Sequence, residues 1–220
     1  MSELPSRPEI AKLNLDMVDP LKNYELLNSV TEEVDLREIT TSAVQEIIAG
    51  MFEVAKGKGH DKRDTRQVVG LAAPQVGVSK RIILIDLTAN GANQEQTLKA
   101  IVNPQITDRS EDVMDGREGC WSCGNVCGNV ERSKNVTLIG YDKDGKPVKY
   151  ELTGFVARIA QHETDHLDGI RFPDRIPDNQ PERLHLVRPE QFEKYRSQWQ
   201  NWKTLCRREQ WEDLKAGRKI

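Results

Sequence analysis

The chain has 220 residues, of which 37% are hydrophobic and 30% are charged, and its formal net charge is −3. This length suits one domain with terminal extensions, and it allows a buried core without disulfides. The charge gives no sign of direct nucleic-acid specificity. No apolar run approaches the roughly 20 residues of a membrane span, and the N-terminus lacks the apolar core of a secretory signal. We therefore expect a cytoplasmic protein with no membrane partner.

The first half of the chain predicts one helix followed by strands. Segment 40–57 carries apolar residues at helical spacing, and Thr41 or Ser42 can cap its first turn. Short apolar runs at 81–88 and 98–107 are typical of strands.

The second half predicts a hairpin, a helix and a tail. Segment 135–154 reads as two strands joined at Asp144-Gly145, a common hairpin turn. Segment 153–169 has helical periodicity, with Thr153 as its cap and Gly169 at its end. The tail predicts an amphipathic helix that packs on the body, through Phe192, Tyr195, Trp199, Trp202 and Leu205. This order indicates an α+β fold with antiparallel or mixed sheets, rather than alternating βαβ units.

A candidate metal site lies in the predicted helix 153–169. His162 and His166 are four residues apart, so their rings share one helix face and can bind one metal ion. Glu163 lies about 100° around the helix and can reach a water held by the metal without being a ligand. Its carboxylate can then transfer the proton of that water. The alternative is a pair of surface histidines, because an HExxH pattern alone is short.

A catalytic metal needs a third protein ligand and an open position. Six residues after His166 the chain has Phe172, where metzincins require histidine. Glu182 and His185 fall in a proline-broken segment that does not read as the helix of a thermolysin-like site. The remaining candidate is Cys120, whose thiolate is a strong ligand for zinc or ferrous iron.

Three segments together resemble the peptide deformylase family: GLAAPQVG at 70–77, EGCWS at 118–122 and QHETDHLDG at 161–169. The family reads GxGLAAxQ, EGCLS and QHExDH in the same order. The resemblance implies a single α+β domain with sheets packed around a central HExxH helix, followed by the helical tail. We expect an N-terminal extension, a deformylase-like catalytic domain and a C-terminal helical extension at 1–20, 21–180 and 181–220.

The resemblance also implies the chemistry. Cys120, His162 and His166 would bind one divalent metal ion, with ferrous iron as the native metal and zinc, nickel or cobalt as substitutes. Glu163 would be the general acid/base. The reaction would remove the N-formyl group from the formylmethionine of newly made polypeptides, and ribosome association is a further partner that the resemblance allows.

The implied substrate site uses residues from all three motifs. Gln75 and the backbone N–H of Trp121 would hold the developing oxyanion, a role that contributes about 10²–10³ in rate per donor. Gly70 and Gly119 would pair with the peptide as an added strand. The pocket for the methionine side chain would include the apolar residues Val69 and Phe155.

Groups behind the ligands are also implied. Glu118 and Arg132 match family positions that pair, and Asp165 is expected to orient a ligand histidine. His60 and His185 are expected to be surface histidines.

The chain departs from the family pattern at several positions. Val68 replaces the first glycine of GxG, and Trp121 replaces a leucine, so its indole is expected to shape substrate binding. Cys123 and Cys127 are additional. A zinc site of these two with Cys120 is an alternative, but it would leave the two histidines without their third ligand, and plain thiols are favoured.

Two other functions remain open from the sequence. One is a related metalloamidase or peptidase with a different acyl specificity, which formyl-Met-Ala and acetyl-Met-Ala would distinguish. The other is a catalytically silent, ribosome-associated relative. A relative that has lost catalytic activity is expected to lack Glu163 or one of the metal ligands. Glu163 and the ligand residues Cys120, His162 and His166 are all present.

Overall fold

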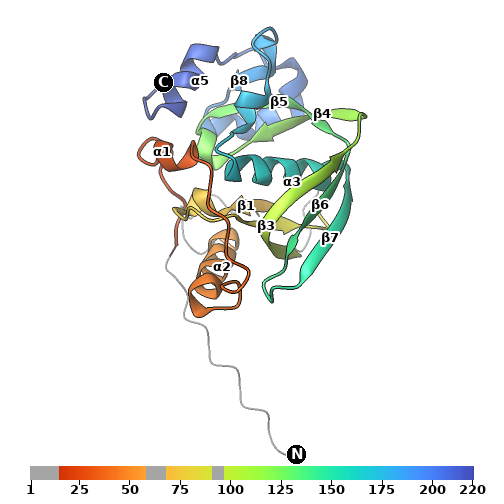
Figure 1. Cartoon of the computed structure of the whole chain (residues 1–220). Coiled ribbons are helices and arrows are strands. Elements are labelled where there is room, and N and C mark those ends of the chain that lie inside the picture. The colour runs from red at the N-terminus through yellow and green to blue at the C-terminus, as the bar shows by residue number, and fades with distance from the viewer. Residues whose placement is uncertain (1–14, 58–67, 91–96) are drawn as a thin grey trace, which may run out of the picture.

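The computed structural model describes residues 15–57, 68–90 and 97–220 (Figure 1). His60, most of residues 56–66 and most of the expected N-terminal extension lie outside these residues. The main helices are α1 (Tyr24–Leu27), α2 (Ser42–Ala55), α3 (Gly154–Leu167), α4 (Phe192–Gln198) and α5 (Arg208–Lys215). The strands are β1 (Gly70–Ala72), β2 (Ile82–Asp86), β3 (Leu98–Arg109), β4 (Val113–Gly119), β5 (Val126–Ser133), β6 (Asn135–Tyr141), β7 (Pro147–Thr153) and β8 (Leu184–Leu186).

The strands form two antiparallel sheets. One has five strands in the order β1-β2-β3-β6-β7, and the other has three in the order β4-β5-β8. The predicted hairpin is β6–β7, and Gly145 has a φ of 76° at its turn, a conformation that glycine adopts without strain. These sheets confirm an α+β fold in a single domain. β1 and β4 are edge strands of their sheets.

Helix α3 contacts strands of both sheets, and Figure 1 shows it between β1–β3 and the β4–β5 hairpin. Its apolar side chains pack into the core of the larger sheet: Ala157, Ile159, Ala160 and Leu167. Burying a large aliphatic side chain contributes about 1.5–3 kcal/mol. Two of its polar side chains reach the smaller sheet: Arg158 donates to the Val130 carbonyl at 2.8 Å and Gln161 to the Ser133 carbonyl at 2.9 Å. These bonds hold the helix against β5.

Helix α2 covers β1 and β2 with its apolar face. Val44, Ile48, Met51 and Val54 are buried against the strands. Thr41 stands at the cap position, but its hydroxyl bonds to the Glu38 carbonyl at 2.7 Å and makes no cap hydrogen bond. Packing therefore stabilises this helix more than capping does.

The prediction of one tail helix through Leu205 was wrong. Helix α4 ends at Gln198, and the following segment runs beside β8, where Leu186 N–H donates to the Thr204 carbonyl and Cys206 N–H to the Leu184 carbonyl, both at 2.9 Å. These strand-like bonds replace the helical ones. Helix α5 then begins at Arg208 and buries the ring of Trp211.

The prediction of a surface position for His185 was also wrong. His185 lies on β8, is buried, and its ring Nε2 donates to the Glu182 carbonyl at 2.9 Å. Its Nδ1 therefore accepts from the hydroxyl of buried Tyr195 at 2.8 Å. Burial lowers the pKa of His185, which favours this neutral ring.

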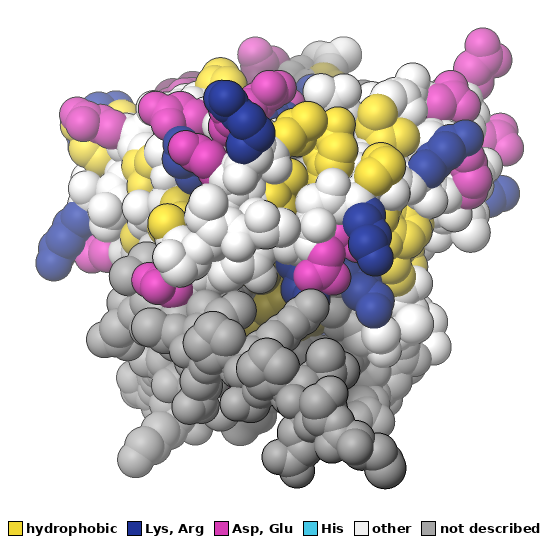
Figure 2. All heavy atoms as spheres, turned by 60° about the horizontal axis from the view of Figure 1, so that its bottom comes forward, with side chains coloured by type: hydrophobic (Ala, Val, Ile, Leu, Met, Phe, Trp, Pro, Cys, Tyr) yellow, Lys and Arg dark blue, Asp and Glu magenta, His cyan; other side chains and the backbone are white. Residues whose placement is uncertain are grey.

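Figure 2 shows the lower face of Figure 1, on which acidic and basic side chains are interspersed around apolar ones over the described residues. Among the helices of the described ranges, none is both long and apolar enough to cross a bilayer.

Candidate metal centre

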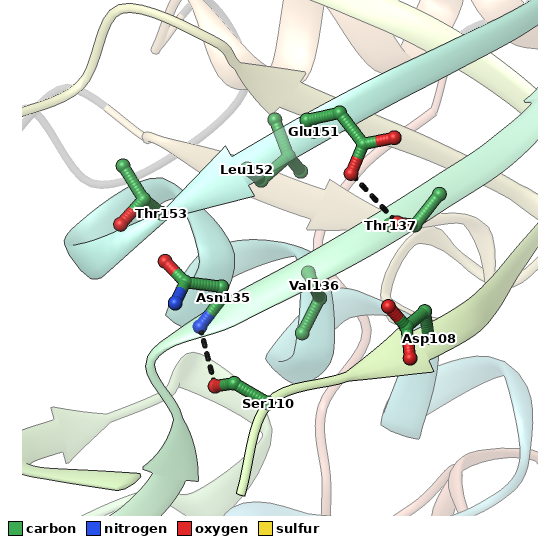
Figure 3. A pocket seen from close by; sticks show the side chains of 8 residues that line it. All are labelled: Asp108, Ser110, Asn135, Val136, Thr137, Glu151, Leu152 and Thr153. Carbon is green, nitrogen blue, oxygen red and sulfur yellow. Dashed lines mark hydrogen bonds between the residues drawn. The ribbon is translucent and has the colours of Figure 1, made fainter. Parts of the chain in front are cut away.

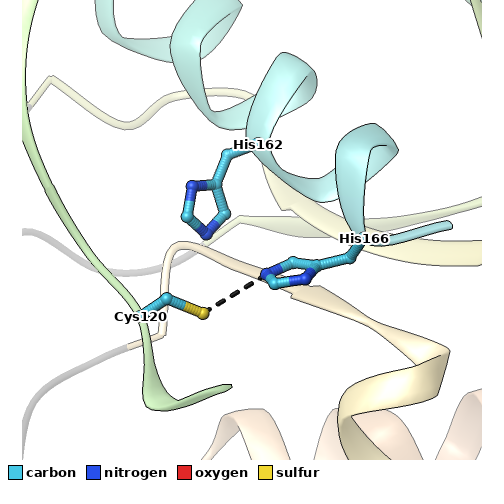
Figure 4. Close-up of side chains that lie close together, drawn as sticks. All are labelled: Cys120, His162 and His166. Atoms are coloured by element: carbon cyan, nitrogen blue, oxygen red, sulfur yellow. Dashed lines mark hydrogen bonds between the residues drawn. The ribbon is translucent and has the colours of Figure 1, made fainter. Parts of the chain in front are cut away.

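Three side chains that could bind a metal ion converge between β4 and α3 (Figure 4). One ligand atom each from Cys120, His162 and His166 lies within 4.8 Å of the other two. Cys120 follows β4 directly, and its sulfur is 3.3 Å from Nε2 of His166. The two imidazoles come from successive turns of α3, and their ring centroids are 5.0 Å apart. Helical spacing thus places two ligands, and the end of a strand supplies the third.

The orientation of His162 is fixed by a buried carboxylate. Nδ1 of His162 lies 2.8 Å from Oε2 of Glu118, so the ring directs Nε2 away from this carboxylate and toward the other ligands. Arg132 binds both oxygens of Glu118 at 2.9 Å, and Arg158 donates to Oε1 at 2.7 Å. Burial alone would raise the pKa of Glu118, but the charge of Arg132 and the bonds from His162 and Arg132 hold it well below its usual range. Glu118 therefore stays ionised and keeps the ring in place.

The expected role of Asp165 is not what the structure shows. Its carboxylate binds Arg132 and Arg175, each at 2.5 Å at the shortest, rather than a ligand histidine. Glu118, rather than Asp165, orients the ring of the ligand candidate His162. Strand alternation could have indicated this, because side chains at 118 and 120 point to the same side of an extended chain. Nδ1 of His166 is buried with no partner among the described residues.

Glu163 lies against the backbone of β1. A Cβ added at Gly70 would stand 2.4 Å from Oε1 of Glu163, so only glycine leaves room for this carboxylate. Oε2 is buried and has no hydrogen-bond partner in the described part of the chain. Burial raises the pKa of Glu163 to about 7, although the nearby histidines oppose the shift. A buried carboxyl oxygen without a partner is costly, and a divalent cation with a water molecule beside it would satisfy this one. The residues therefore fit a metal centre.

Gln75 points its amide nitrogen at the same centre. It lies in a 3₁₀ turn, Ala73–Val76, directly after β1. Its Oε1 accepts from Ala72 N–H at 2.8 Å, so its Nε2 must face the other way, where it lies 3.3 Å from the Cys120 sulfur and 3.3 Å from the Ser122 hydroxyl. The turn thus presents a fixed donor beside the ligands.

The side chain of Trp121 is 46% exposed rather than enclosed. Its Nε1 donates to the Val18 carbonyl at 3.2 Å, and Val18 N–H donates to the Gln75 carbonyl at 2.9 Å. Val18 therefore links the motif that carries Gln75 to the motif that carries Cys120. An effect of the indole on substrate binding stays a prediction.

Two of the expected substrate residues lie on edge strands. Gly70 is the first residue of edge strand β1, and Gly119 is the last residue of edge strand β4. Val69 and Phe155 are partly buried and pack against the same apolar cluster under the larger sheet. Val68 is partly buried and packs against the cluster beneath α2.

The additional cysteines do not join the ligand set. Cys123 and Cys127 are both buried, and among the described residues neither belongs to a group of three that could hold a metal ion. Cys127 packs with Val187 and Tyr195, whereas Cys123 packs in a separate cluster with Trp211. This separation opposes the three-cysteine zinc site.

Two surface hollows lie away from the ligands. One, of about 270 Å³, is bounded by the strand ends around Asn135 and Thr153, and in it Thr137 donates to Glu151 at 2.7 Å (Figure 3). The other, of about 810 Å³, lies beside residues 33–36. Neither is lined by a candidate metal ligand.

A Cys–His–His group that could hold a metal ion, with a buried glutamate beside it on an antiparallel α+β scaffold, is an arrangement typical of mononuclear metallohydrolases. The family model for polypeptide deformylase matches residues 18–182. The chain belongs to the polypeptide deformylase family.

Known members of the family resemble the chain in sequence and structure. It is 44% identical over 108 residues to a peptide deformylase of Thermodesulfovibrio yellowstonii, covering 49% of this chain and 64% of that protein. It is 41% identical over 129 residues to a peptide deformylase of Treponema pallidum, covering 59% of this chain and 70% of that protein.

The fold is similar to that of the actinonin-bound class I type b peptide deformylase of Acinetobacter baumannii. The TM-score is 0.60 at 30% identity, over 76% of this chain and 99% of that chain. A peptide deformylase of Ehrlichia chaffeensis gives a TM-score of 0.59 at 25% identity, over 77% of this chain and 90% of that chain.

Proposed function

We propose that this protein is a metal-dependent hydrolase that removes the N-formyl group from the N-terminal formylmethionine of newly made polypeptides. The observation that carries the proposal is the convergence of three ligand atoms within 4.8 Å beside the buried Glu163 carboxyl. The names of the relatives support it, as does the Acinetobacter baumannii peptide deformylase structure with Met-Ala-Ser bound.

The proposed ligands are Cys120, His162 and His166, and the proposed native metal is ferrous iron, with zinc, nickel or cobalt as substitutes. One thiolate and two imidazoles suit ferrous iron and zinc. When bound, the ion would supply a positive charge beside the formyl oxygen and acidify a coordinated water.

Glu163 is the proposed general acid/base. Its free oxygen can take the proton of the attacking water and then deliver it to the nitrogen of the departing peptide amine. The products are formate and a peptide with a free N-terminus. Gln75 Nε2 and the backbone N–H of Trp121 donate to the oxyanion that develops on the formyl oxygen. A fixed donor suits this role because it does not reorganise during the reaction.

The proposed peptide site lies between the edges of β1 and β4. An extended peptide could pair there as an added strand, with Gly70 and Gly119 as its backbone partners. Val69 and Phe155 would contact the methionine side chain. Residues 21–180 form the proposed catalytic domain, with α3 at its centre. Since the substrates are nascent chains, cytoplasmic location and ribosome association are part of the proposal.

The test of this function compares two acyl groups. Protein loaded anaerobically with ferrous iron, or in air with nickel, should release formate from formyl-Met-Ala and leave acetyl-Met-Ala intact. A chelator should abolish formate release, and the metal should restore it. Equal hydrolysis of both peptides, or of the acetyl peptide alone, would point to another metalloamidase.

Gly70→Ala should retain the metal and lower kcat. The new methyl would stand 2.4 Å from Oε1 of Glu163 and 2.7 Å from Cγ2 of Ile159, while β1 is held by its pairing with β2. A displacement of the carboxyl by about 1 Å can cost on the order of 10²-fold in rate. Steady-state kinetics and metal analysis would check this. Gly119→Ala is the control, because its methyl would meet only the Cys127 sulfur, at 3.2 Å, and should reduce kcat less.

Trp121→Leu should change KM and the ranking of formyl-Met, formyl-Leu and formyl-norleucine peptides, while kcat on the best substrate changes less than about tenfold. The backbone N–H remains in this variant, so the losses are contacts of the ring with the substrate and the bond of the indole to the Val18 carbonyl. Trp121→Phe is the matched control, since it keeps a ring but loses the bond to the Val18 carbonyl. An equal fall of kcat in both variants, with unchanged ranking, would show that the link to Val18 matters instead.

A further inference from the structure

Cys123 lies one tight turn after the proposed ligand Cys120. Its N–H donates to the Cys120 carbonyl at 3.0 Å, which closes a turn over Trp121 and Ser122. The ends of such a turn are less than about 7 Å apart at their Cα atoms. Disulfides span Cα separations of roughly 4.4–6.8 Å. The backbone therefore already holds the two cysteines at a distance suited to a disulfide.

The two side chains also lie in the same apolar surroundings. Cys123 is fully buried, whereas Cys120 is partly buried and packs against the cluster that contains Cys123. An oxidant from solvent would thus reach Cys120 first. The proposed deformylase chemistry has no use for Cys123.

The other cysteines are placed differently. Cys127 packs with Val187 and Tyr195, in a cluster separate from that of Cys123. The Cys206 thiol contacts the Arg207 carbonyl at 3.5 Å, and burial raises its pKa to about 11, which disfavours the reactive thiolate. Cys123 is therefore the partner that the fold offers to Cys120.

We propose that Cys120 and Cys123 form a redox modification site, at which a peroxide converts the two cysteines into a disulfide and the metal ion is released. The inference rests on the proposed function in one respect, because Cys120 is taken as a metal ligand.

The chemistry balances in two steps. The Cys120 thiolate attacks one oxygen of hydrogen peroxide, the O–O bond breaks, and Cys120 sulfenic acid and hydroxide form. The Cys123 sulfur then attacks the Cys120 sulfur, the S–O bond breaks, and the hydroxyl leaves with the Cys123 proton as water. The sulfur pair loses two electrons, and the peroxide gains them.

Loss of the thiolate leaves only His162 and His166 for the ion, and two imidazoles are one ligand short of a catalytic site. The disulfide also has a protective consequence. Sulfenic acid that meets no thiol can be oxidised further to sulfinic acid, which thiols do not reverse. Cys123 would trap the sulfenic acid before that step and make the loss of metal reversible.

The test uses the zinc-loaded enzyme, because zinc has no redox chemistry of its own. After treatment with hydrogen peroxide, peptide mass mapping should find Cys120 linked to Cys123, and a chromogenic chelator should detect released zinc. Dithiothreitol should restore both thiols and zinc binding. Cys127→Ala is the matched control and should behave like the wild type.

Cys123→Ala should instead accumulate sulfinic acid at Cys120, with zinc loss that dithiothreitol does not reverse. Cys123→Ser is a second variant that preserves the volume of this buried side chain. A wild type with oxidised Cys120 and a free Cys123 thiol, a disulfide to another cysteine, or full recovery of both Cys123 variants would overturn the proposal. None of these readouts uses deformylation, so a failure of the proposed activity would be seen separately.

Discussion

Glu163→Gln should bind about one metal ion per chain and lose at least ~10²-fold in kcat on formyl-Met-Ala. Glutamine preserves the shape of the side chain beneath Gly70, but its amide accepts no proton from the attacking water. The three ligand atoms are untouched by this change. Metal analysis and steady-state kinetics on the same preparation would measure both quantities.

A matched control is Glu193→Gln, which makes the same chemical change at an exposed position on α4. It should leave both metal content and kcat unchanged. Near-normal kcat in Glu163→Gln would show that another group moves the proton and would remove Glu163 from its proposed role.

The same substitution has a pH signature in the metal-free protein. Burial raises the pKa of Glu163 to about 7 in the folded chain, so the folded state binds the proton more tightly than the unfolded state does. The stabilising effect of the protonated carboxyl is complete below its unfolded pKa and is lost as pH rises through about 7. The variant should therefore gain stability over the wild type above pH ~7, by up to about 3 kcal/mol, and little near pH ~4. Urea unfolding with a chelator present would measure the difference.

Helical periodicity, short apolar runs and a hairpin turn signal in the sequence predicted α2, α3, β2, β3 and the β6–β7 pair. These elements bury one continuous apolar face, so their patterns are strong. The β4–β5 hairpin was not predicted, because β4 reads VMDGREG and has little apolar alternation. Its role depends on polar contacts instead: Glu118 lies on it, and Arg158 reaches its backbone at the Met114 carbonyl.

The ends of the chain show the limit of local patterns. His185 was expected at the surface, but β8 pairs with β5 and buries the ring against Tyr195. The tail had helical spacing through Leu205, yet hydrogen bonds to β8 extend the chain from 202 to 206. Both outcomes depend on partners distant in the sequence, which periodicity does not report.

The candidate site was more predictable than the fold around it, since its spacing is local. His162, Glu163 and His166 lie within two turns of one helix, so their arrangement follows from helix geometry alone. The groups that orient them come from elsewhere. Arg132 on β5 and Arg175 beyond α3 decide that Asp165 binds guanidinium groups, which leaves Glu118 for His162.

Cys120→Ala should lose nearly all bound metal, and kcat should fall by at least about 10³-fold, the rate equivalent of several kcal/mol of charge stabilisation by the ion. The substitution removes the one thiolate of the ligand set and leaves two imidazoles. It also removes the acceptor at 3.3 Å from Gln75 Nε2, although the bond from Ala72 N–H still orients that amide. Metal content after gel filtration, together with formate release, would measure the loss.

Substitutions of Cys123 and Cys127 test whether the loss of metal is specific to Cys120. Cys127→Ala removes a buried thiol that packs with Val187 and Tyr195, and Cys123→Ala removes a buried thiol that packs in the cluster with Trp211. Under reducing conditions each should keep about one metal ion per chain and most activity, because neither thiol belongs to the proposed ligand set. Loss of metal from either variant as complete as in Cys120→Ala would instead favour a site built from the three cysteines. His162 and His166 would then lack their third ligand, and the proposed hydrolase centre would fail with them.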